Sequence, residues 1–231
     1  MSASTGWIRT ARTVLPRLLV LSRETHPTWW LDSAAQIDDG FLEAEGISGL
    51  VWDVDGTLTA HHAREVHASV RARFDALRVA PGLRHAIVSN CQLPRFVELG
   101  ELFPDMPVIL GFSTDEGIAF RVRSRGTEAF TGPGAKALEA GEASTPIRKP
   151  NADLVGEALR QMGMSDAPEA AVMIGDQYFT DIVSANLAGI RSLKVRTIDP
   201  PSFPTPVRLS QKLERGWVGG LRGLGLVRRH G

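Results

Sequence analysis

Two aspartates separated by one residue follow a short apolar run in the segment Val51-Trp-Asp-Val-Asp-Gly-Thr-Leu-Thr59. The run is too short for a helix, and we interpret it as a buried strand that ends at Asp53 and Asp55. Two neighbouring carboxylates repel each other unless a cation lies between them or one of them holds a proton. A hard divalent cation and a general acid would satisfy these two conditions. The alternative interpretation is a strand followed by an ordinary surface turn, because Asp and Gly both favour turns.

A second and a third polar group lie where further predicted elements end or begin. Ser89 and Asn90 follow the apolar run at residues 86–88, and a hydroxyl beside the N–H groups of a helix start forms a phosphate cradle. Lys149 precedes a predicted helix and would supply a positive charge for a phosphate or for a pair of acids. The alternatives are an ordinary helix cap and a surface lysine.

A fourth group follows the apolar run at residues 170–174. Asp176 and Asp181 lie just after it, where they could share a cation with Asp53, and Gly175 would allow close approach of the backbone. The alternative interpretation is a capped turn before the next helix.

Strands and helices alternate over residues 46–200, which predicts an α/β fold with a parallel sheet covered by helices on both faces. The apolar patterns predict strands at 49–54, 86–89, 170–175 and 191–196, and helices around 66–77, 96–102, 154–162 and 182–187. Alternating apolar and polar residues around a Ser-Arg-Gly turn predict a β-hairpin insert at 118–131. Only 36 positions separate Asp53 from Ser89, which leaves no room for a large helical cap.

In this order the four groups resemble the motifs of the haloacid dehalogenase-like superfamily, with its Rossmann-like sheet. The short gap after the first motif and the sequence GDQYFTD are similar to subclass IIIA phosphatases. The segments GISGLVWDVDGTLTA, VSN and GDQYFTDIVSANLAGIRSLKV resemble the YqeG-like group, which includes phosphatidylglycerophosphate phosphatases. Two departures are Gly56, where that group usually has Asn, and the 60 positions from Ser89 to Lys149, a longer stretch than is usual there.

The resemblance implies a Mg²⁺-dependent phosphatase. Asp53 would be the nucleophile that forms an aspartyl-phosphate, and Asp55 would protonate the leaving oxygen and then activate water. Mg²⁺ would be held by Asp53, by the carbonyl of Asp55 and by Asp176.

The remaining residues of the motifs would surround the phosphate and the metal. Ser89 and Lys149 would bind phosphoryl oxygens as part of the catalytic set, with Thr57 and Asn90 as further substrate contacts. Gly175, Thr180 and Asp181 would support the metal site, and Asp181 or Thr180 would be an alternative metal contact. We interpret three nearby histidines as residues of the loop and helix surface near the mouth of the site, because Mg²⁺ prefers oxygen ligands: His61, His62 and His67.

Residues 1–45 and 201–231 flank the predicted phosphatase domain at 46–200. We expect a helical leader that packs on or beside the core, and a Pro/Gly-rich tail that forms a short helix at best. Residues 1–30 carry a net charge of +3 and residues 201–231 carry +5, so the rest of this neutral chain carries −8. The basic ends also carry apolar residues, which predicts peripheral contact with an anionic membrane.

Composition limits the classes of protein to which the chain could belong. A net charge of zero argues against a nucleic-acid-coating protein. The single cysteine excludes an intrachain disulfide, and the sequence lacks a membrane-spanning apolar run and a signal-like segment, so we expect a cytoplasmic protein at the inner membrane surface. The expected partner is a phosphorylated substrate such as a lipid phosphate, and no oligomeric state is predicted. Two alternatives remain: a phosphatase for soluble sugar phosphates or nucleotides, and a non-catalytic binding module.

Overall fold

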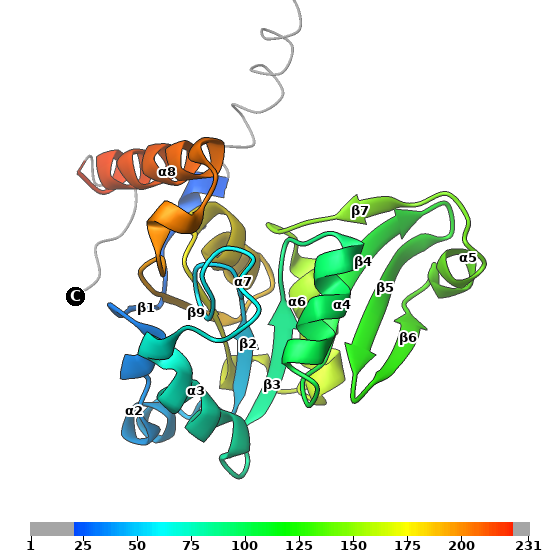
Figure 1. Cartoon of the computed structure of the whole chain (residues 1–231), viewed down its shortest axis with the longest axis horizontal. Helices are drawn as coiled ribbons and strands as arrows, with labels where there is room; N and C mark the ends of the chain where they lie inside the picture. Colours follow the sequence, from blue (N-terminus) through cyan, green and yellow to red (C-terminus); the bar gives the residue numbers. More distant parts are fainter. Residues whose placement is uncertain (1–20, 224–231) are drawn as a thin grey trace, which may run out of the picture.

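Six parallel strands form the centre of a mixed sheet in the computed structural model, which describes residues 21–223 (Figure 1). This sheet confirms the predicted α/β fold class and all four predicted strands. In spatial order the parallel strands are β1 (Trp29–Trp30), β9 (Arg191–Lys194), β8 (Ala171–Gly175), β2 (Gly49–Trp52), β3 (Arg84–Val88) and β4 (Val108–Thr114).

Helices cover both faces of the sheet because the buried strands are apolar on both sides. Leu50 and Trp52 of β2 point into one core and Val51 points into the other, as the two-residue period of a strand requires. The first core contains residues of α2 (Asp39–Ala44), α3 (Ala68–Val79) and α4 (Leu93–Leu102). The second contains residues of α6 (Ala152–Met162) and α7 (Val183–Leu187).

The direction in which the sheet grows changes at β2. After β2 the chain adds β3 and β4 on one side, and it later adds β8 and β9 on the other. In open α/β sheets a ligand crevice forms outside the carboxyl ends of the strands at such a switch point. Asp53, Ser89 and Asp176 follow β2, β3 and β8 within two residues, so the three strands deliver them to one edge.

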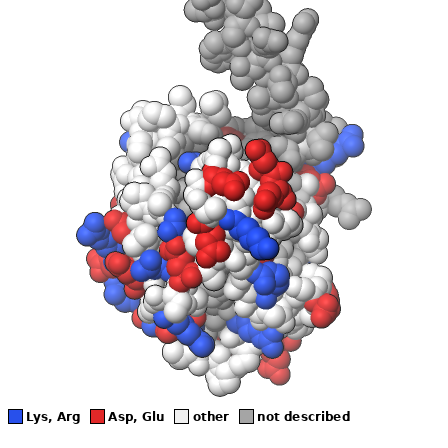
Figure 2. Space-filling view, turned by 90° about the vertical axis from the view of Figure 1, so that its right-hand side faces the viewer, with Lys and Arg blue, Asp and Glu red and all other residues white. Residues whose placement is uncertain are grey.

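The predicted hairpin at 118–131 is confirmed as β5 (Gly117–Ser124) and β6 (Thr127–Thr131). Rather than standing apart from the core, it extends the sheet antiparallel from β4, and the short helix α5 (Ala135–Glu139) follows it. Figure 2 shows basic and acidic side chains interspersed on one face of the molecule. On the hairpin, Arg121 and Arg123 both pair with Glu128. Within residues 21–223, no separate domain lies between Asp53 and Ser89, as predicted.

A short strand, β7 (Thr145–Ile147), brings Lys149 to the switch point. It pairs with Gly111–Ser113 of β4, whereas β3 pairs with β4 only at Val108 and Ile109. Strand β5 occupies one edge of β4 along its whole length. Strands β3 and β7 therefore share the other edge of β4, and β7 begins its pairing beyond the point where the pairing with β3 ends. Two residues later the chain reaches Lys149, beside the residues that follow β3.

The C-terminal segment corrects our prediction of a short helix at best in 201–231. Helix α8 (Thr205–Gly223) has 19 residues and, in Figure 1, lies on the opposite side of the molecule from β5 and β6. Val218 is buried against Tyr178 and Ile182. The glycines of α8 have a low helix propensity, but the packing of Val218 stabilises the helix, since tertiary contacts override propensity. Residues 224–231 lie outside the described residues.

The predicted helical leader is described only from residue 21 onward. Its later part contains β1, which pairs with β9, a 3₁₀ turn at Ala34–Gln36, and α2. Residues 29–44 therefore contribute to the central sheet and its first core, while the predicted domain boundary at 46 stays a prediction. Of the helices within residues 21–223, none combines the length and apolarity that a bilayer crossing requires.

Candidate active site

A buried lysine joins two of the predicted acids at the carboxyl edge of the sheet. The Nζ atom of Lys149 donates to Asp53 Oδ1 at 2.6 Å and to Asp181 Oδ1 at 2.7 Å. The side chains of Lys149 and Asp181 are each only 1% exposed. Lys149 therefore connects an acid 96 positions before it and an acid 32 positions after it in one desolvated charge cluster.

Asp176 completes this cluster and provides the main indication of a cation. Carboxylate oxygens of Asp53, Asp176 and Asp181 lie within 4.8 Å of one another. Both oxygens of Asp176 are buried without a hydrogen bond of normal geometry in the described part of the chain, although Thr197 lies close enough to lower its pKa. A buried carboxylate without a donor is costly, and a bound Mg²⁺ ion would satisfy it with the oxygen ligands that it prefers.

The shifted pKa values of the cluster also indicate a site for a cation. Burial raises the pKa of Asp53 to about 8; Lys149 opposes this shift, while Asp181 and Asp176 add to it. Burial and the charge of Asp181 raise the pKa of Asp176 to about 6. For Lys149, burial lowers the pKa, but Asp181 and Asp53 more than offset this, so its pKa is raised. Three carboxylates lie around the ammonium of Lys149, and the charge of Lys194 also acts on Asp176. The acids still outnumber these two lysines, which is an environment that suits a divalent cation.

Two glycines permit the close approach of these acids. A Cβ atom on Gly175 would overlap the side chain of Asp181, so this position needs glycine, as the sequence suggested. Gly56 has a φ of +94°, and a Cβ atom there would lie 2.9 Å from Asp176 Oδ2 and 3.1 Å from Phe203. Gly56, where the YqeG-like group usually has Asn, therefore lies directly against the acidic cluster.

Asp55 bonds to the loop that follows it and to α4, and it is anchored through one oxygen. Its Oδ1 atom accepts from the Thr59 hydroxyl at 3.2 Å, from the backbone N–H of His62 at 3.1 Å and from Arg95 at 2.8 Å. Among the residues described, none donates a hydrogen bond to its Oδ2 atom. This arrangement leaves one oxygen of Asp55 available to a ligand.

The sequence analysis missed Arg95, which lies in the first turn of α4. Its side chain is 4% exposed and also bonds to Glu98 and to the carbonyl of Ala63. One signal was present, because Arg95 lies beside Phe96 on the buried part of an amphipathic helix, where an arginine requires partners.

The remaining predicted residues surround Lys149 and Asp53. The side-chain amide of Asn90 accepts from the N–H of Lys149 at 2.8 Å and donates to its carbonyl at 3.2 Å, so it orients the lysine backbone. The Thr57 hydroxyl donates to Asp53 Oδ2 at 3.2 Å. Ser89 is 8% exposed, and its hydroxyl forms no hydrogen bond within residues 21–223. Of Asn90, Thr57 and Ser89, the serine is the residue whose side-chain donor remains available to a ligand.

A groove lies between α8 and the turn that carries Asp181. Thr180 lies in a π-helical turn, Tyr178–Ile182, and lines a groove of about 660 Å³ together with Phe179, Leu213 and Trp217. Glu214 of α8 accepts from the N–H of Phe179 at 2.8 Å, and burial raises the pKa of this glutamate to about 7. Helix α8 therefore contacts the turn that carries Asp181, which the sequence analysis did not foresee.

Two comparisons with known proteins bear on this arrangement. The family model described as HAD-hydrolase-like matches residues 146–197. The curated protein named phosphatidylglycerophosphate phosphatase 1, chloroplastic, from Chlamydomonas reinhardtii is 26% identical over 183 residues, which are 79% of this chain and 56% of that protein. Together they support the haloacid dehalogenase-like superfamily. The chain spans little more than half the length of this curated relative.

The residues that match the family model include part of the charge cluster. Lys149, Asp176 and Asp181 lie within the matched residues, and Asp53 is joined to them by the contacts of Lys149. A solved structure of an uncharacterized protein from Listeria monocytogenes serotype 4b also matches, with 17% identity and a TM-score of 0.38, over 67% of this chain and 88% of that chain. A hydrolase of the haloacid dehalogenase-like type, with a divalent metal at its acidic cluster, agrees with the site geometry and the family match.

Proposed function

We propose that this chain is a Mg²⁺-dependent phosphomonoester hydrolase that acts through an aspartyl-phosphate on Asp53. A carboxylate oxygen of Asp53 attacks phosphorus, and the bond from phosphorus to the leaving oxygen breaks. Asp55 gives its proton to that oxygen through Oδ2. Asp55 then accepts a proton from a water molecule, which attacks the phosphorus of the aspartyl-phosphate, releases inorganic phosphate and regenerates Asp53.

The residues around Asp53 have separate tasks in this proposal. Lys149 holds Asp53 in place and neutralises an oxygen of the phosphoryl group, and Ser89 donates a hydrogen bond to another. Asp53, Asp176 and the backbone carbonyl of Asp55 would hold Mg²⁺, which when bound neutralises charge on the transferring group. Asp181 orients Lys149, and Asn90 holds the lysine backbone.

One observation carries the proposal. A lysine that is 1% exposed joins Asp53 to Asp181 at the switch point of the sheet, beside a buried Asp176 that accepts no hydrogen bond of normal geometry from the described residues. A structural ion pair would need only one acid for Lys149. Three carboxylates at one buried point serve better to bind a cation and an anionic substrate together.

A lipid phosphate is the substrate that we propose within this class. The relative from Chlamydomonas reinhardtii is named as a phosphatase of phosphatidylglycerophosphate, a lipid phosphate, and Leu213 and Trp217 of α8 line the groove next to Thr180. Leu209 and Leu213 lie one helical turn apart on α8 and are 56% and 66% exposed. Arg208 and Lys212 are also exposed, so α8 combines apolar and basic groups suited to the surface of an anionic membrane.

Phosphate release with and without Mg²⁺ tests the proposal. The substrates are phosphatidylglycerophosphate in mixed micelles, a set of sugar phosphates and a set of nucleotides. We expect Mg²⁺-dependent release from the lipid that is absent in Asp53→Asn, a nearly isosteric variant. Release from soluble phosphates alone would keep the hydrolase and overturn the lipid substrate. Release that is unchanged in Asp53→Asn would overturn the mechanism, and a lack of release from every substrate would favour a binding module.

A further inference from the structure

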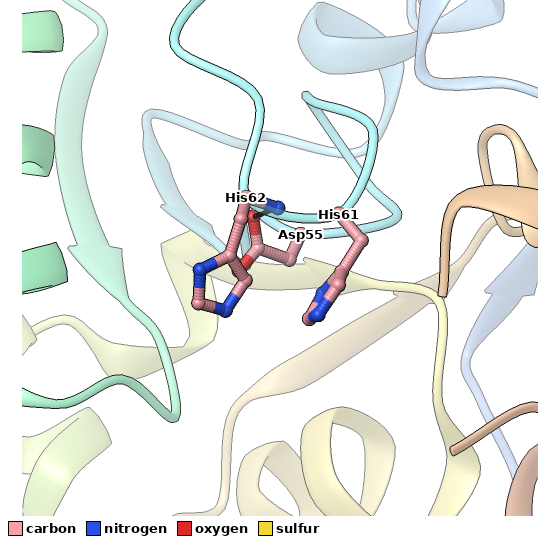
Figure 3. A group of neighbouring side chains, drawn as sticks. All are labelled: Asp55, His61 and His62. Atoms are coloured by element: carbon pink, nitrogen blue, oxygen red, sulfur yellow. Dashed lines mark hydrogen bonds between the residues drawn. The ribbon is translucent and has the colours of Figure 1, made fainter. Parts of the chain in front are cut away.

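Two adjacent histidines lie beside Asp55, outside the acidic cluster. We call Asp55, His61 and His62 the histidine cluster; Figure 3 shows both imidazole rings projecting from one loop on the same side as the carboxylate. One ligand atom from each of the three residues lies within 4.8 Å of the others. The sequence analysis placed these histidines near the mouth of the site and gave them no further task.

The contacts of His61 hold its ring in place, and the ring of the exposed His62 lies against it. The ring of His61 stacks on Phe203 with 4.7 Å between centroids, and its backbone N–H donates to the Ser202 hydroxyl at 3.0 Å. His62 has a φ of +56°, an uncommon conformation for a residue with a side chain, and its ring centroid lies 4.2 Å from that of His61. The Nδ1 atom of His61 is buried and has no hydrogen-bond partner among the described residues. An unpartnered imidazole nitrogen in a fixed ring is a ready metal ligand.

The donor atoms define which ion this cluster would take. Two imidazole nitrogens and one carboxylate oxygen suit Zn²⁺ and similar transition metals, whereas Mg²⁺ prefers oxygen ligands alone. The free Oδ2 atom of Asp55 can serve as the oxygen ligand while Oδ1 keeps its bonds to the loop and to Arg95. The guanidinium of Arg95 repels a bound cation, so the binding should be reversible rather than structural.

We propose that the histidine cluster is a binding site for a transition-metal ion such as Zn²⁺, separate from the Mg²⁺ cluster. Bound Zn²⁺ occupies the oxygen that Asp55 uses for proton transfer and thereby inhibits hydrolysis. Only this consequence for activity rests on the proposed function. The binding itself follows from the geometry of the three residues.

Calorimetric titration with Zn²⁺ in a large excess of Mg²⁺ tests the binding. We expect the parent chain to bind one Zn²⁺ that the His61→Ala/His62→Ala variant does not bind. His62→Gly, which suits the left-handed backbone at this position, should weaken the binding without disturbing the loop. The matched control is His67→Asn, which lies nearby and retains a side chain able to cap α3 in place of His67. Equal Zn²⁺ binding in the parent and both cluster variants, or no binding by the parent, would overturn the proposal.

Phosphate release measured in the same samples separates this proposal from the proposed function. We expect Zn²⁺ to inhibit the parent and the His67→Asn control at concentrations that leave the double variant active. Zn²⁺ binding by a parent chain that hydrolyses no substrate would support the metal site and contradict the hydrolase. Hydrolysis that Zn²⁺ inhibits equally in the parent and the double variant would support the hydrolase and contradict the histidine cluster as the inhibitory site.

Discussion

The two oxygens of Asp55 have different surroundings, and this difference has consequences at the scale of one residue. Oδ1 is held by three donors, whereas Oδ2 accepts no hydrogen bond within residues 21–223. Asp55→Asn replaces a group that can give and take a proton with an amide that cannot. We expect turnover to fall about 10²–10⁴-fold, the usual contribution of a positioned acid–base group. Substrates with poor leaving groups should show the larger loss in steady-state kinetics, and equal turnover on them would contradict the role of Asp55.

Arg95 acts on the chemistry only by positioning Asp55. Arg95→Gln removes the cation 2.8 Å from Asp55 Oδ1 and leaves the carboxylate less well oriented. We expect a lower kcat with little change in KM, and a larger loss on poor leaving groups, which need the proton most. Arg64→Gln is the matched control, because this arginine pairs with Glu98 on the surface and is 82% exposed. Equal losses in the two variants, or a loss that is the same for all leaving groups, would contradict the positioning role.

At the scale of elements, local patterns predicted most of the fold. The strands around β2 and the helices α3, α4, α6 and α7 have clear apolar periods and are confirmed. Strand β7 has three residues and includes Pro146, so only its pairing with β4 reveals it. The length of helix α8 was underestimated because the prolines at and before its start, together with its glycines, suggest a linker. Its stability depends on contacts with Tyr178 and Ile182, which are distant in the sequence.

The exposed apolar residues of α8 yield a prediction for this element. Leu209→Ser/Leu213→Ser removes two side chains that are more than half exposed, so the fold should stay intact. We expect weaker co-sedimentation with phosphatidylglycerol vesicles, while release of phosphate from a micelle-free substrate is unchanged. The control is Val79→Ser at the end of α3, which is 74% exposed and lies on another element. The binding should also weaken with added salt. Vesicle binding that is equal in all three proteins would contradict membrane contact through α8.

At the scale of the whole molecule, the sequence predicted the acids and Lys149 because each one ends or begins a recognisable element. It did not predict Arg95 or Glu214, whose partners lie 40 and 35 positions away and are brought together only by the packed helices. Asn90 was expected to touch substrate, but both atoms of its amide contact the backbone of Lys149. Motif order therefore identifies the reacting groups, and long-range packing identifies the residues that hold them.

The stability of the whole molecule should depend on the charge of the acidic cluster. The pKa of Asp53 is raised from 3.8 to about 8, so between these values the folded chain binds more protons than the unfolded chain. Its contribution to the free energy of unfolding is fully present below pH 3.8 and is lost as the pH rises to about 8. Asp176 behaves in the same way up to about pH 6.

Between pH 6 and 8 Asp53 is thus the acid of this pair that titrates. In the presence of a chelator, we expect the free energy of unfolding in urea to fall more steeply over this range in the parent than in Asp53→Asn. Added Mg²⁺ should stabilise the parent more at pH 8 than at pH 6, because it binds the ionised cluster. Parallel pH profiles for the two proteins would contradict the raised pKa.

The most direct test of the account is to trap the covalent intermediate on Asp53. Protein that is turning over a phosphorylated substrate in Mg²⁺ is quenched with acid and reduced with borohydride, which converts an aspartyl-phosphate into homoserine. Peptide mass spectrometry then locates the modified residue, with Asp53→Asn and a sample without Mg²⁺ as controls. We predict homoserine at position 53 in the parent, only when substrate and Mg²⁺ are both present. Turnover without modification at this position, or modification at another residue, would contradict the central role of Asp53.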